Sequence, residues 1–307
     1  MTLVLGLDVG GTSSRALITT RDGTRLGSGR AGAGNPVSVP LADAVTSVAA
    51  AVRAALSGLD PAAVRSAVMG IAGTGRFADP MVAAAFGRAF AELGLTVPVR
   101  PVGDVEVAYA AGTAEPRGTV LISGTGAIAA RIEHGVMTTT ADGIGWLLGD
   151  LGSGFWLGRE AAALTARELY TRVPDGHLTR AVATAVLGAV PAAASRQAAD
   201  DLIGALHAQE PRHLSRLAPL VTEAAEAGDP AAAALVERAA AHLVDAVAEV
   251  HRDGPVVLAG SVLLGSRPVR EAVIRLLAGR LPAVAAPTAG PGEVGAARLA
   301  ADLLARR

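Results

Sequence analysis

Two glycine turns flanked by hydroxyl residues are the features of this sequence best suited to chemistry. The first lies in LGLDVGGTSSRALI (residues 5–18), around Thr12, and the second in GTVLISGTGAIAARI (118–132), around Thr125. Glycine lets backbone N–H groups approach a ligand closely, and hydroxyl groups add donors, so such turns can hold a phosphate. One turn alone could be an ordinary hairpin. Its repetition at a domain-sized interval favours an internal duplication with two phosphate loops.

Two aspartates accompany these turns. Asp8 stands two residues before Gly10 of the first glycine pair, where it could hold Mg²⁺ through water molecules or could be the acid of an Asx turn. Asp104 stands just before an expected helix, whose N-terminus would favour the ionised carboxylate, although an N-cap role is the alternative. Arg15 could add positive charge or point away from the turn. Because no Gly-Lys-Ser/Thr phosphate loop is present, a phosphate would rely on N–H groups, hydroxyls and a metal.

The elements that position these residues follow from hydropathy periods. Alternating or continuous apolar runs predict strands, and apolar residues three and four apart predict helices. In the first half we expect strands at 3–9, 15–20, 24–30, 66–71 and 97–102, and helices at 41–56, 81–93 and 105–111. In the second half we expect a strand hairpin at 118–132, a packed irregular loop at 143–158, mostly helix at 159–250, a strand at 255–263, and helices at 267–281 and 295–305.

The composition limits the classes of function that this chain could have. The 307 residues suffice for two domains. With 27 Lys plus Arg against 28 Asp plus Glu, we expect neither a nucleic-acid nor a membrane partner. The start shows no signal-peptide pattern, and no apolar run reaches about 20 residues, which predicts a cytoplasmic protein. The chain has no cysteine, which excludes disulfides, thiolate nucleophiles, cysteine-ligated zinc and iron–sulfur clusters.

Five motifs in order resemble a known superfamily. They are DVGGTSSR (8–15), GD (103–104), ISGTGA (122–127), GIGWLLGDLGSG (143–154) and LAGSV (258–262). The chain resembles the superfamily of actin, sugar kinases and heat-shock chaperones, and more closely the N-acetylglucosamine kinase branch of the BadF/BadG/BcrA/BcrD-type ATPase family. That family also holds activators of 2-hydroxyacyl-CoA dehydratases. The missing cysteines exclude the activator role, which needs an iron–sulfur cluster.

The resemblance implies an α/β fold of two actin-like (ribonuclease-H-like) domains around a central ATP cleft. Each domain would have a mixed five-stranded sheet flanked by helices. The N-terminal domain would span 1–114 and the C-terminal domain 115–291. The last helix, at about 292–307, would return to the N-terminal domain.

The resemblance also implies the binding residues for ATP and Mg²⁺. Asp8 would be the magnesium residue, acting through water. Gly260 and Ser261 would form an adenosine turn, although a plain strand-to-helix connection is the alternative. The full set implied for ATP and its phosphates is Gly10, Gly11, Thr12, Ser123, Gly124, Thr125, Gly126, Gly260 and Ser261.

For the acceptor, the resemblance implies that Asp104 is the catalytic acid–base residue. Asn35 would contact the sugar, although before Pro36 it could simply form a turn. The remaining implied sugar contacts are Gly143, Ile144, Gly145 and Asp150. Ile144 stands where the family usually has an aromatic residue, and Leu151 stands where it has a glutamate, which puts the exact sugar in doubt. Trp146 could pack in the core or floor the sugar site.

The implied function is transfer of the ATP γ-phosphate to the 6-hydroxyl of N-acetylglucosamine by a cytoplasmic homodimer. A glucosamine or other hexose kinase is the enzymatic alternative. A nucleotide-gated sugar sensor without catalysis is the alternative from another class, and the presence of Asp104 favours catalysis over it.

Overall fold

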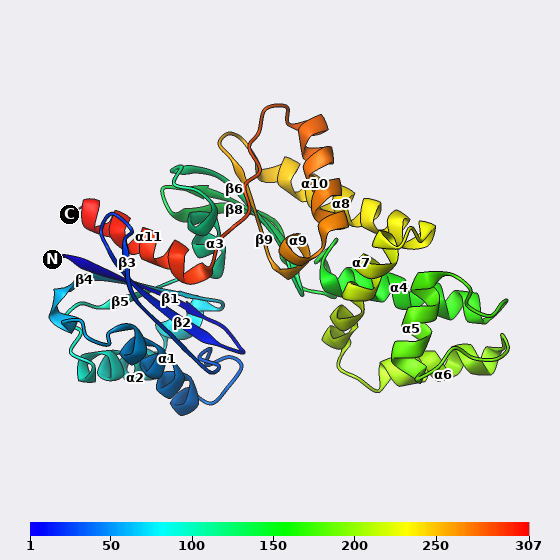
Figure 1. Ribbon diagram of the computed structural model, residues 1–307, viewed down its shortest axis with the longest axis horizontal. Coiled ribbons are helices and arrows are strands. Elements are labelled where there is room, and N and C mark those ends of the chain that lie inside the picture. The colour runs from blue at the N-terminus through cyan, green and yellow to red at the C-terminus, as the bar shows by residue number, and fades with distance from the viewer. Residues whose placement is uncertain (307) are drawn as a thin grey trace. The chain divides into compact units, whose positions relative to one another are not determined.

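The computed structural model describes residues 1–306 in two compact units (Figure 1). Unit 1 contains Met1–Pro116, Ile132–Met137 and the chain from Ala289 onward, and unit 2 contains Arg117–Arg131 and Thr138–Thr288. The tip of a hairpin, 132–137, therefore belongs to unit 1 although the rest of its strands belongs to unit 2.

Unit 1 is built on a five-stranded sheet in the order β3-β2-β1-β4-β5. Strand β2 pairs antiparallel with both β1 and β3. Strand β4 pairs parallel with both β1 and β5. The strands are β1 (Leu3–Val9), β2 (Ser14–Thr20), β3 (Arg25–Ala31), β4 (Val64–Ile71) and β5 (Val99–Val102). These bounds confirm the strands expected from the sequence to within a few residues.

Helices cover both faces of this sheet, which is why β1 is apolar almost without interruption. Leu5 and Leu7 pack in the same cluster as α1 and α2, while Val4 packs on the opposite face with α3 and α11. Gly6 permits this second contact, since a Cβ there would clash with the backbone nitrogen of Ala297 in α11. The helices are α1 (Leu41–Ala55), α2 (Pro80–Glu92), α3 (Asp104–Gly112) and α11 (Gly292–Ala305), with short 3₁₀ turns η1 (Pro61–Ala63) and η2 (Thr74–Ala78).

The sheet of unit 2 has the order β8-β7-β6-β9, with β6 and β9 parallel. The strands are β6 (Arg117–Ser123), β7 (Ala127–Glu133), β8 (Val136–Asp142) and β9 (Val256–Ala259). The expected fifth strand is wrong for the described residues, because beside β9 only an isolated bridge joins Leu258 to Thr288. Pro287 accepts a bond from the Leu258 nitrogen but has no N–H to return one, so no ladder forms.

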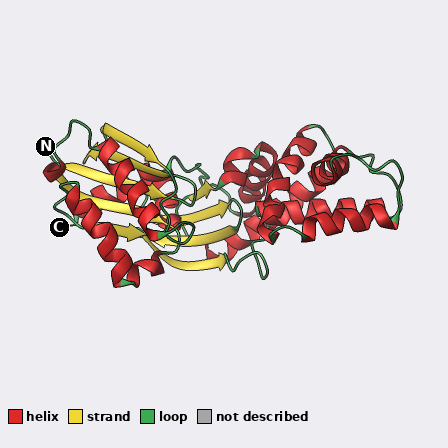
Figure 2. Ribbon diagram, turned by 90° about the horizontal axis from the view of Figure 1, so that it is seen from below, coloured by secondary structure: helices red, strands yellow, loops and turns green. Residues whose placement is uncertain are grey.

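Helices fill most of unit 2, as the view in Figure 2 shows. In α8 the buried positions recur three and four residues apart, from Ala232 to Val250, and face the sheet cluster. The helices are α4 (Gly154–Leu169), α5 (His177–Leu187), α6 (Arg196–His207), α7 (Ala218–Glu226), α8 (Pro230–Val250), α9 (Ser261–Gly265) and α10 (Arg267–Arg280), with the 3₁₀ turn η3 (Pro211–Leu217). No helix in the described chain is both long and apolar enough to cross a bilayer.

Two local expectations for unit 2 are corrected. The irregular loop expected at 143–158 ends earlier, because α4 begins at Gly154, where the Ser153 hydroxyl accepts a bond from the Trp156 N–H at 3.1 Å. The strand expected at 255–263 stops at Ala259, and α9 starts after Gly260. In both places a capping or left-handed residue ends one element sooner than hydropathy alone indicates.

Candidate functional site

The first glycine turn joins β1 to β2 in unit 1. The Gly10 N–H donates to the Ser13 carbonyl at 2.9 Å, and the Gly10 carbonyl accepts from the N–H of Asn35 at 3.2 Å. Gly11 and Thr12 are exposed at the tip. A Cβ on Gly11 would lie 2.7 Å from the Ser38 hydroxyl oxygen, so a larger residue there would have to displace the Ser38 side chain. The turn thus offers an exposed backbone and a hydroxyl to a ligand, as expected for a phosphate loop.

Asp8 lies at the base of this turn, against the N-terminus of α11. A Cβ on Gly292 would lie 2.7 Å from the Asp8 carboxyl carbon. On its other side, Arg15 Nη1 is 3.7 Å from Asp8 Oδ2, so Arg15 points toward the turn rather than away. Burial raises the pKa of Asp8, the charges of Glu293 and Asp104 raise it further, and Arg15 lowers it. The first unit therefore gathers negative charge where the hairpin turn begins.

Asp104 is the first residue of α3, and its N-cap is Gly103, so the N-cap alternative is wrong. Burial raises the pKa of Asp104, although hydrogen bonds from the N–H groups of Asp104 and Val105 lower it. The helix N-terminus lowers the pKa of Asp104, as expected, but the loss of solvation raises it by more. A carboxylate with a raised pKa is the better base for a hydroxyl proton.

Glu293 is a residue that the sequence reasoning missed. It is the second residue of α11, and its Oε2 is buried without a hydrogen-bond partner. Its charge acts on Asp8. The only signal in the sequence is a Gly-Glu pair at the start of the final helix. Glu293 comes close to Asp8 because this helix packs against Gly6 of β1.

The carboxylates of unit 1 fit Mg²⁺ held through water. Carboxylate oxygens are preferred ligands of this ion, which keeps several waters. The Glu293 Oε2 atom is buried without a hydrogen-bond partner, and burial, followed by the charge of Glu293, raises the pKa of Asp8 although Arg15 lowers it, so an added cation would stabilise the charged form of Asp8. Within residues 1–306, no three His, Cys, Asp or Glu side chains stand close enough to hold an ion directly. Water-mediated binding of Mg²⁺ by Asp8 stays a prediction.

Asn35 is buried beside the first turn. Its amide Nδ2 donates to the Ala72 carbonyl at 3.1 Å, and its Oδ1 accepts from the Val37 N–H at 2.9 Å. The second bond is an Asx turn, which confirms the turn-forming alternative. A sugar contact by Asn35 remains a prediction.

The second glycine turn joins β6 to β7 in unit 2. The Gly124 N–H donates to the Gly126 carbonyl at 2.9 Å, and the N–H groups that open α4 donate to the carbonyls of Gly124 and Thr125 at 2.7 and 3.2 Å. The Ser123 hydroxyl is buried and donates to the Gly152 carbonyl at 2.9 Å, so it supports the turn. Gly260 has φ of 91°, and a Cβ there would clash with the Ser123 carbonyl oxygen.

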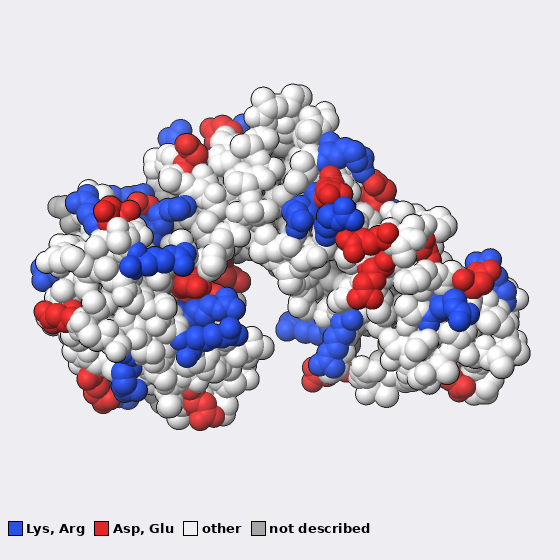
Figure 3. Space-filling model, viewed as in Figure 1, with Lys and Arg blue, Asp and Glu red and all other residues white. Residues whose placement is uncertain are grey.

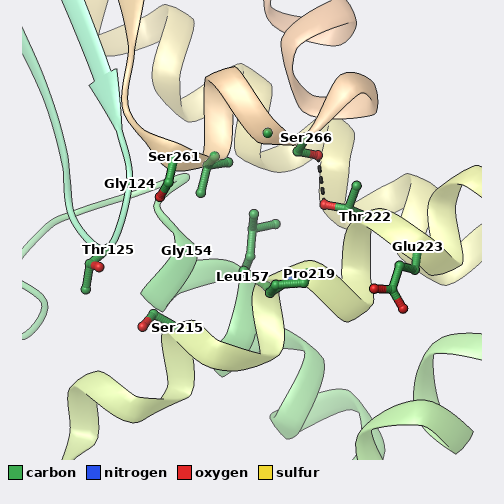
Figure 4. Close-up of a pocket in the computed structure, with 13 residues that line it drawn as sticks. Gly124, Thr125, Gly154, Leu157, Ser215, Pro219, Thr222, Glu223, Ser261 and Ser266 are labelled. Atoms are coloured by element: carbon green, nitrogen blue, oxygen red, sulfur yellow. Dashed lines mark hydrogen bonds between the residues drawn. The ribbon is translucent and has the colours of Figure 1, made fainter. Parts of the chain in front are cut away.

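A pocket of about 420 Å³ opens beside this turn (Figure 4). Gly124, Thr125 and Ser261 border one end, and the other holds Thr222, whose hydroxyl donates to the Ser266 hydroxyl at 2.8 Å. Glu223 is the one charged residue among those that line it in the described chain. The volume lies within the usual range of small-molecule sites. The sequence reasoning named Ser261 but missed Thr222 and Glu223 in α7 and Ser266 between α9 and α10, which no local motif marks.

Asp150 lies against the second turn. Its Oδ1 accepts from the Ala127 N–H at 3.1 Å, and a Cβ on Gly126 would lie 2.9 Å from its Oδ2. Burial raises the pKa of Asp150, the Ala127 N–H lowers it, Asp142 raises it and Arg212 lowers it. Asp150 therefore supports the phosphate turn directly, and its contact with a sugar remains a prediction.

Asp142, which the sequence reasoning missed, holds the loop that leads to Asp150. Its Oδ1 accepts from the N–H groups of Gly143 and Asp150 at 2.8 and 2.6 Å, and its Oδ2 from that of Leu151 at 2.8 Å. An Asp-Gly pair at a strand end was the available signal. Between these anchors Gly143 and Gly145 have positive φ and Ile144 is exposed.

The charged side chains form no extended single-sign field on the face seen in Figure 3, where basic residues alternate with Asp and Glu. This agrees with the near-balance of the composition.

Known proteins resemble this chain over nearly its whole length. A model of the BadF/BadG/BcrA/BcrD ATPase family matches residues 5–300. No curated protein matches the sequence significantly. Among solved structures, a protein described as a candidate N-acetylglucosamine kinase from Chromobacterium violaceum is 27% identical, with a TM-score of 0.71 over 97% of this chain and 99% of that one.

Two further structures share the fold. A candidate N-acetylglucosamine kinase from Porphyromonas gingivalis is 20% identical, with a TM-score of 0.71 over 98% of this chain and 99% of that one. A ROK family glucokinase from Streptomyces griseus, in complex with glucose and AMPPNP, is 20% identical, with a TM-score of 0.55 over 97% and 98%. These similarities confirm the α/β class with two actin-like domains.

Proposed function

We propose that this chain, which belongs to the BadF/BadG/BcrA/BcrD ATPase family, is an ATP-dependent kinase that phosphorylates the 6-hydroxyl of N-acetylglucosamine. The observation that carries the proposal is the second glycine turn, which opens directly onto a pocket of nucleoside size. The same kind of turn recurs in unit 1, where Asp8 lies at its base and is affected by the charges of Glu293 and Asp104.

The pocket favours a neutral base and ribose. Among its described lining residues Glu223 carries the one charge, and it is negative, so a phosphate is disfavoured at that end. At the other end, Gly124 and Thr125 offer an exposed backbone and a hydroxyl. We therefore place the nucleoside beside Thr222 and Ser266, and the phosphates at the turn.

Magnesium would be held through water by Asp8, with Glu293 adding negative charge nearby. The ion would neutralise charge on the phosphate oxygens during transfer. Arg15 would limit repulsion between Asp8 and an incoming phosphate, because its guanidinium lies 3.7 Å from that carboxylate.

Asp104 would accept the proton of the 6-hydroxyl as that oxygen bonds to the γ-phosphorus and ADP leaves with the bridging oxygen. Its raised pKa makes it a stronger base than an exposed aspartate. N-acetylglucosamine is proposed as acceptor because the Chromobacterium violaceum protein carries that description. Glucosamine, another hexose and the non-catalytic sensor remain the alternatives, and a cytoplasmic homodimer belongs to the same proposal.

The test is a panel of sugars incubated with ATP and Mg²⁺, with ADP release measured and the product position assigned by NMR. We expect 6-phosphorylation of N-acetylglucosamine, and a loss of turnover of about 10²- to 10⁴-fold in Asp104→Asn with ATP binding retained. Nucleotide binding without transfer to any sugar would support the sensor and refute the kinase.

A further inference from the structure

The 3₁₀ turn η3 has three faces, because residues three apart in such a turn lie above one another. Leu214 and Leu217 form the face that packs on the core of unit 2, where Leu217 is buried and Leu214 contacts the same apolar cluster. The Leu214 carbonyl lies so close to Gly158 of α4 that a Cβ on this glycine would clash with it. This tight packing on α4 fixes where the other two faces of η3 point.

Arg212 and Ser215 share the second face, which borders the second glycine turn. Ser215 lines the pocket together with Gly124 and Thr125, and Figure 4 shows it on the opposite side of the pocket from Glu223. The Ser215 hydroxyl donates to the Arg212 carbonyl at 2.7 Å, so the two residues stand one turn apart. With a rise of about 2 Å per residue, the Arg212 backbone lies about 6 Å along the turn from Ser215.

The guanidinium of Arg212 is available to a ligand. Its side chain is exposed, and no hydrogen bond or ion pair holds it within residues 1–306. Burial raises the pKa of Asp150, whereas the Arg212 charge lowers it, so the guanidinium acts on a carboxylate that touches the turn. That carboxylate accepts from the Ala127 N–H at 3.1 Å. A free cation therefore stands beside the proposed phosphate loop.

The second turn itself carries no positive side chain. Its segment ISGTGA (122–127) contains neither arginine nor lysine, and the Asp150 carboxylate lies against Gly126. A polyphosphate at this turn would meet repulsion from that carboxylate. Phosphoryl transfer depends on positive groups that stabilise the charge spread over the transferred group. A planar guanidinium suits this role, because it can donate two parallel hydrogen bonds to phosphate oxygens.

We propose that Arg212 is a catalytic residue that binds the terminal phosphate of ATP held at the second glycine turn. The inference rests on the proposed kinase function, and the turn, the pocket and Arg212 all belong to unit 2. During transfer the acceptor oxygen bonds to the γ-phosphorus, its proton passes to Asp104, and the bridging oxygen leaves with ADP. The Arg212 guanidinium donates to the γ-phosphate oxygens and stabilises their charge during this step.

The test compares AMPPNP, a non-hydrolysable ATP analogue, with ADP by calorimetry in the presence of Mg²⁺. In Arg212→Ala the Kd of AMPPNP should rise about 10- to 100-fold, as expected for lost hydrogen bonds between charged groups, while the Kd of ADP changes less than twofold. With sugar present, kcat should fall about 10²- to 10³-fold, and added guanidinium ion should restore part of it. Arg212→Lys should bind AMPPNP with intermediate affinity, because it keeps the charge but loses the paired donors.

Arg216→Ala is the matched control. Arg216 is equally exposed, but it lies on the third face of η3 with His213, away from the Ser215 face. It should keep the wild-type affinities and kcat. Because both arginines are exposed, the melting temperatures of both variants should stay within a few degrees of the wild type.

If the ratio of AMPPNP to ADP affinity in Arg212→Ala stayed within twofold of the wild type, the inference would be overturned. The same loss in Arg216→Ala would also overturn it, because it would reflect general surface charge. A wild-type protein that binds AMPPNP but phosphorylates no sugar would instead refute the proposed function, and the affinity ratio would then decide the phosphate contact of Arg212 by itself.

Discussion

Replacing Gly292 with alanine tests how α11 positions Asp8. Alanine favours a helix over glycine by up to about 1 kcal/mol, so propensity alone predicts a more stable protein. The new Cβ, however, would lie 2.7 Å from the Asp8 carboxyl carbon and 2.9 and 3.0 Å from its oxygens. Two carbons prefer a separation of about 3.5–4.0 Å. The Asp8 carboxylate must therefore swing away by about 1 Å.

This displacement should reduce activity more than stability. A misplacement of about 1 Å at a reacting centre can cost about 100-fold in rate. We expect kcat/KM for ATP to fall about 10- to 100-fold in Gly292→Ala, with a higher Mg²⁺ requirement and a melting temperature within a few degrees of the wild type. Coupled ADP release at a series of Mg²⁺ concentrations and circular dichroism measure the two effects.

Gly87→Ala is the matched control, because Gly87 lies exposed in α2 of the same unit, and a Cβ added there would meet no atom within 4 Å. It should raise the free energy of unfolding by about 0.5–1 kcal/mol and leave kcat/KM unchanged. If Gly292→Ala kept kcat/KM within twofold of the wild type, the placement of Asp8 at the phosphate site would be refuted.

Three further predictions concern protonation and packing. Because burial raises the pKa of Asp104 above 3.8, kcat/KM should fall as the pH drops through that raised pKa and the base becomes protonated. The same fall at low pH in the residual activity of Asp104→Asn would contradict this assignment. Burial raises the pKa of Asp229, but hydrogen bonds from N–H groups including that of Leu178 lower it overall. Asp229→Ala should therefore lower the free energy of unfolding by about 1–3 kcal/mol at pH 7, and this loss should shrink in denaturation curves as the pH falls through the lowered pKa. Gly260→Ala should destabilise unit 2 by at least about 2 kcal/mol, whereas Gly204→Ala should not.

Local chemistry explains which elements the sequence predicts well. The strands of unit 1 and helices such as α1 and α2 follow from apolar periods and from breaks at Gly and Pro, which act within a few residues. The glycine turns at Thr12 and Thr125 were found for the same reason. The fifth strand expected in unit 2 failed because Pro287 removes a donor in a register that only the folded sheet defines.

The amino-acid sequence was therefore enough to establish the α/β order of elements, the duplicated turns and the exclusion of cysteine chemistry. Which carboxylates act together depends on the folded chain: Glu293 reaches Asp8 because α11 packs on Gly6, and Asp150 reaches Gly126 because Asp142 holds the loop between them. Folding also sets the pKa of Asp104, where loss of solvation outweighs the helix N-terminus. Contacts between residues far apart in the chain, and the burial that these contacts cause, cannot be predicted from the spacing of apolar residues within a short segment.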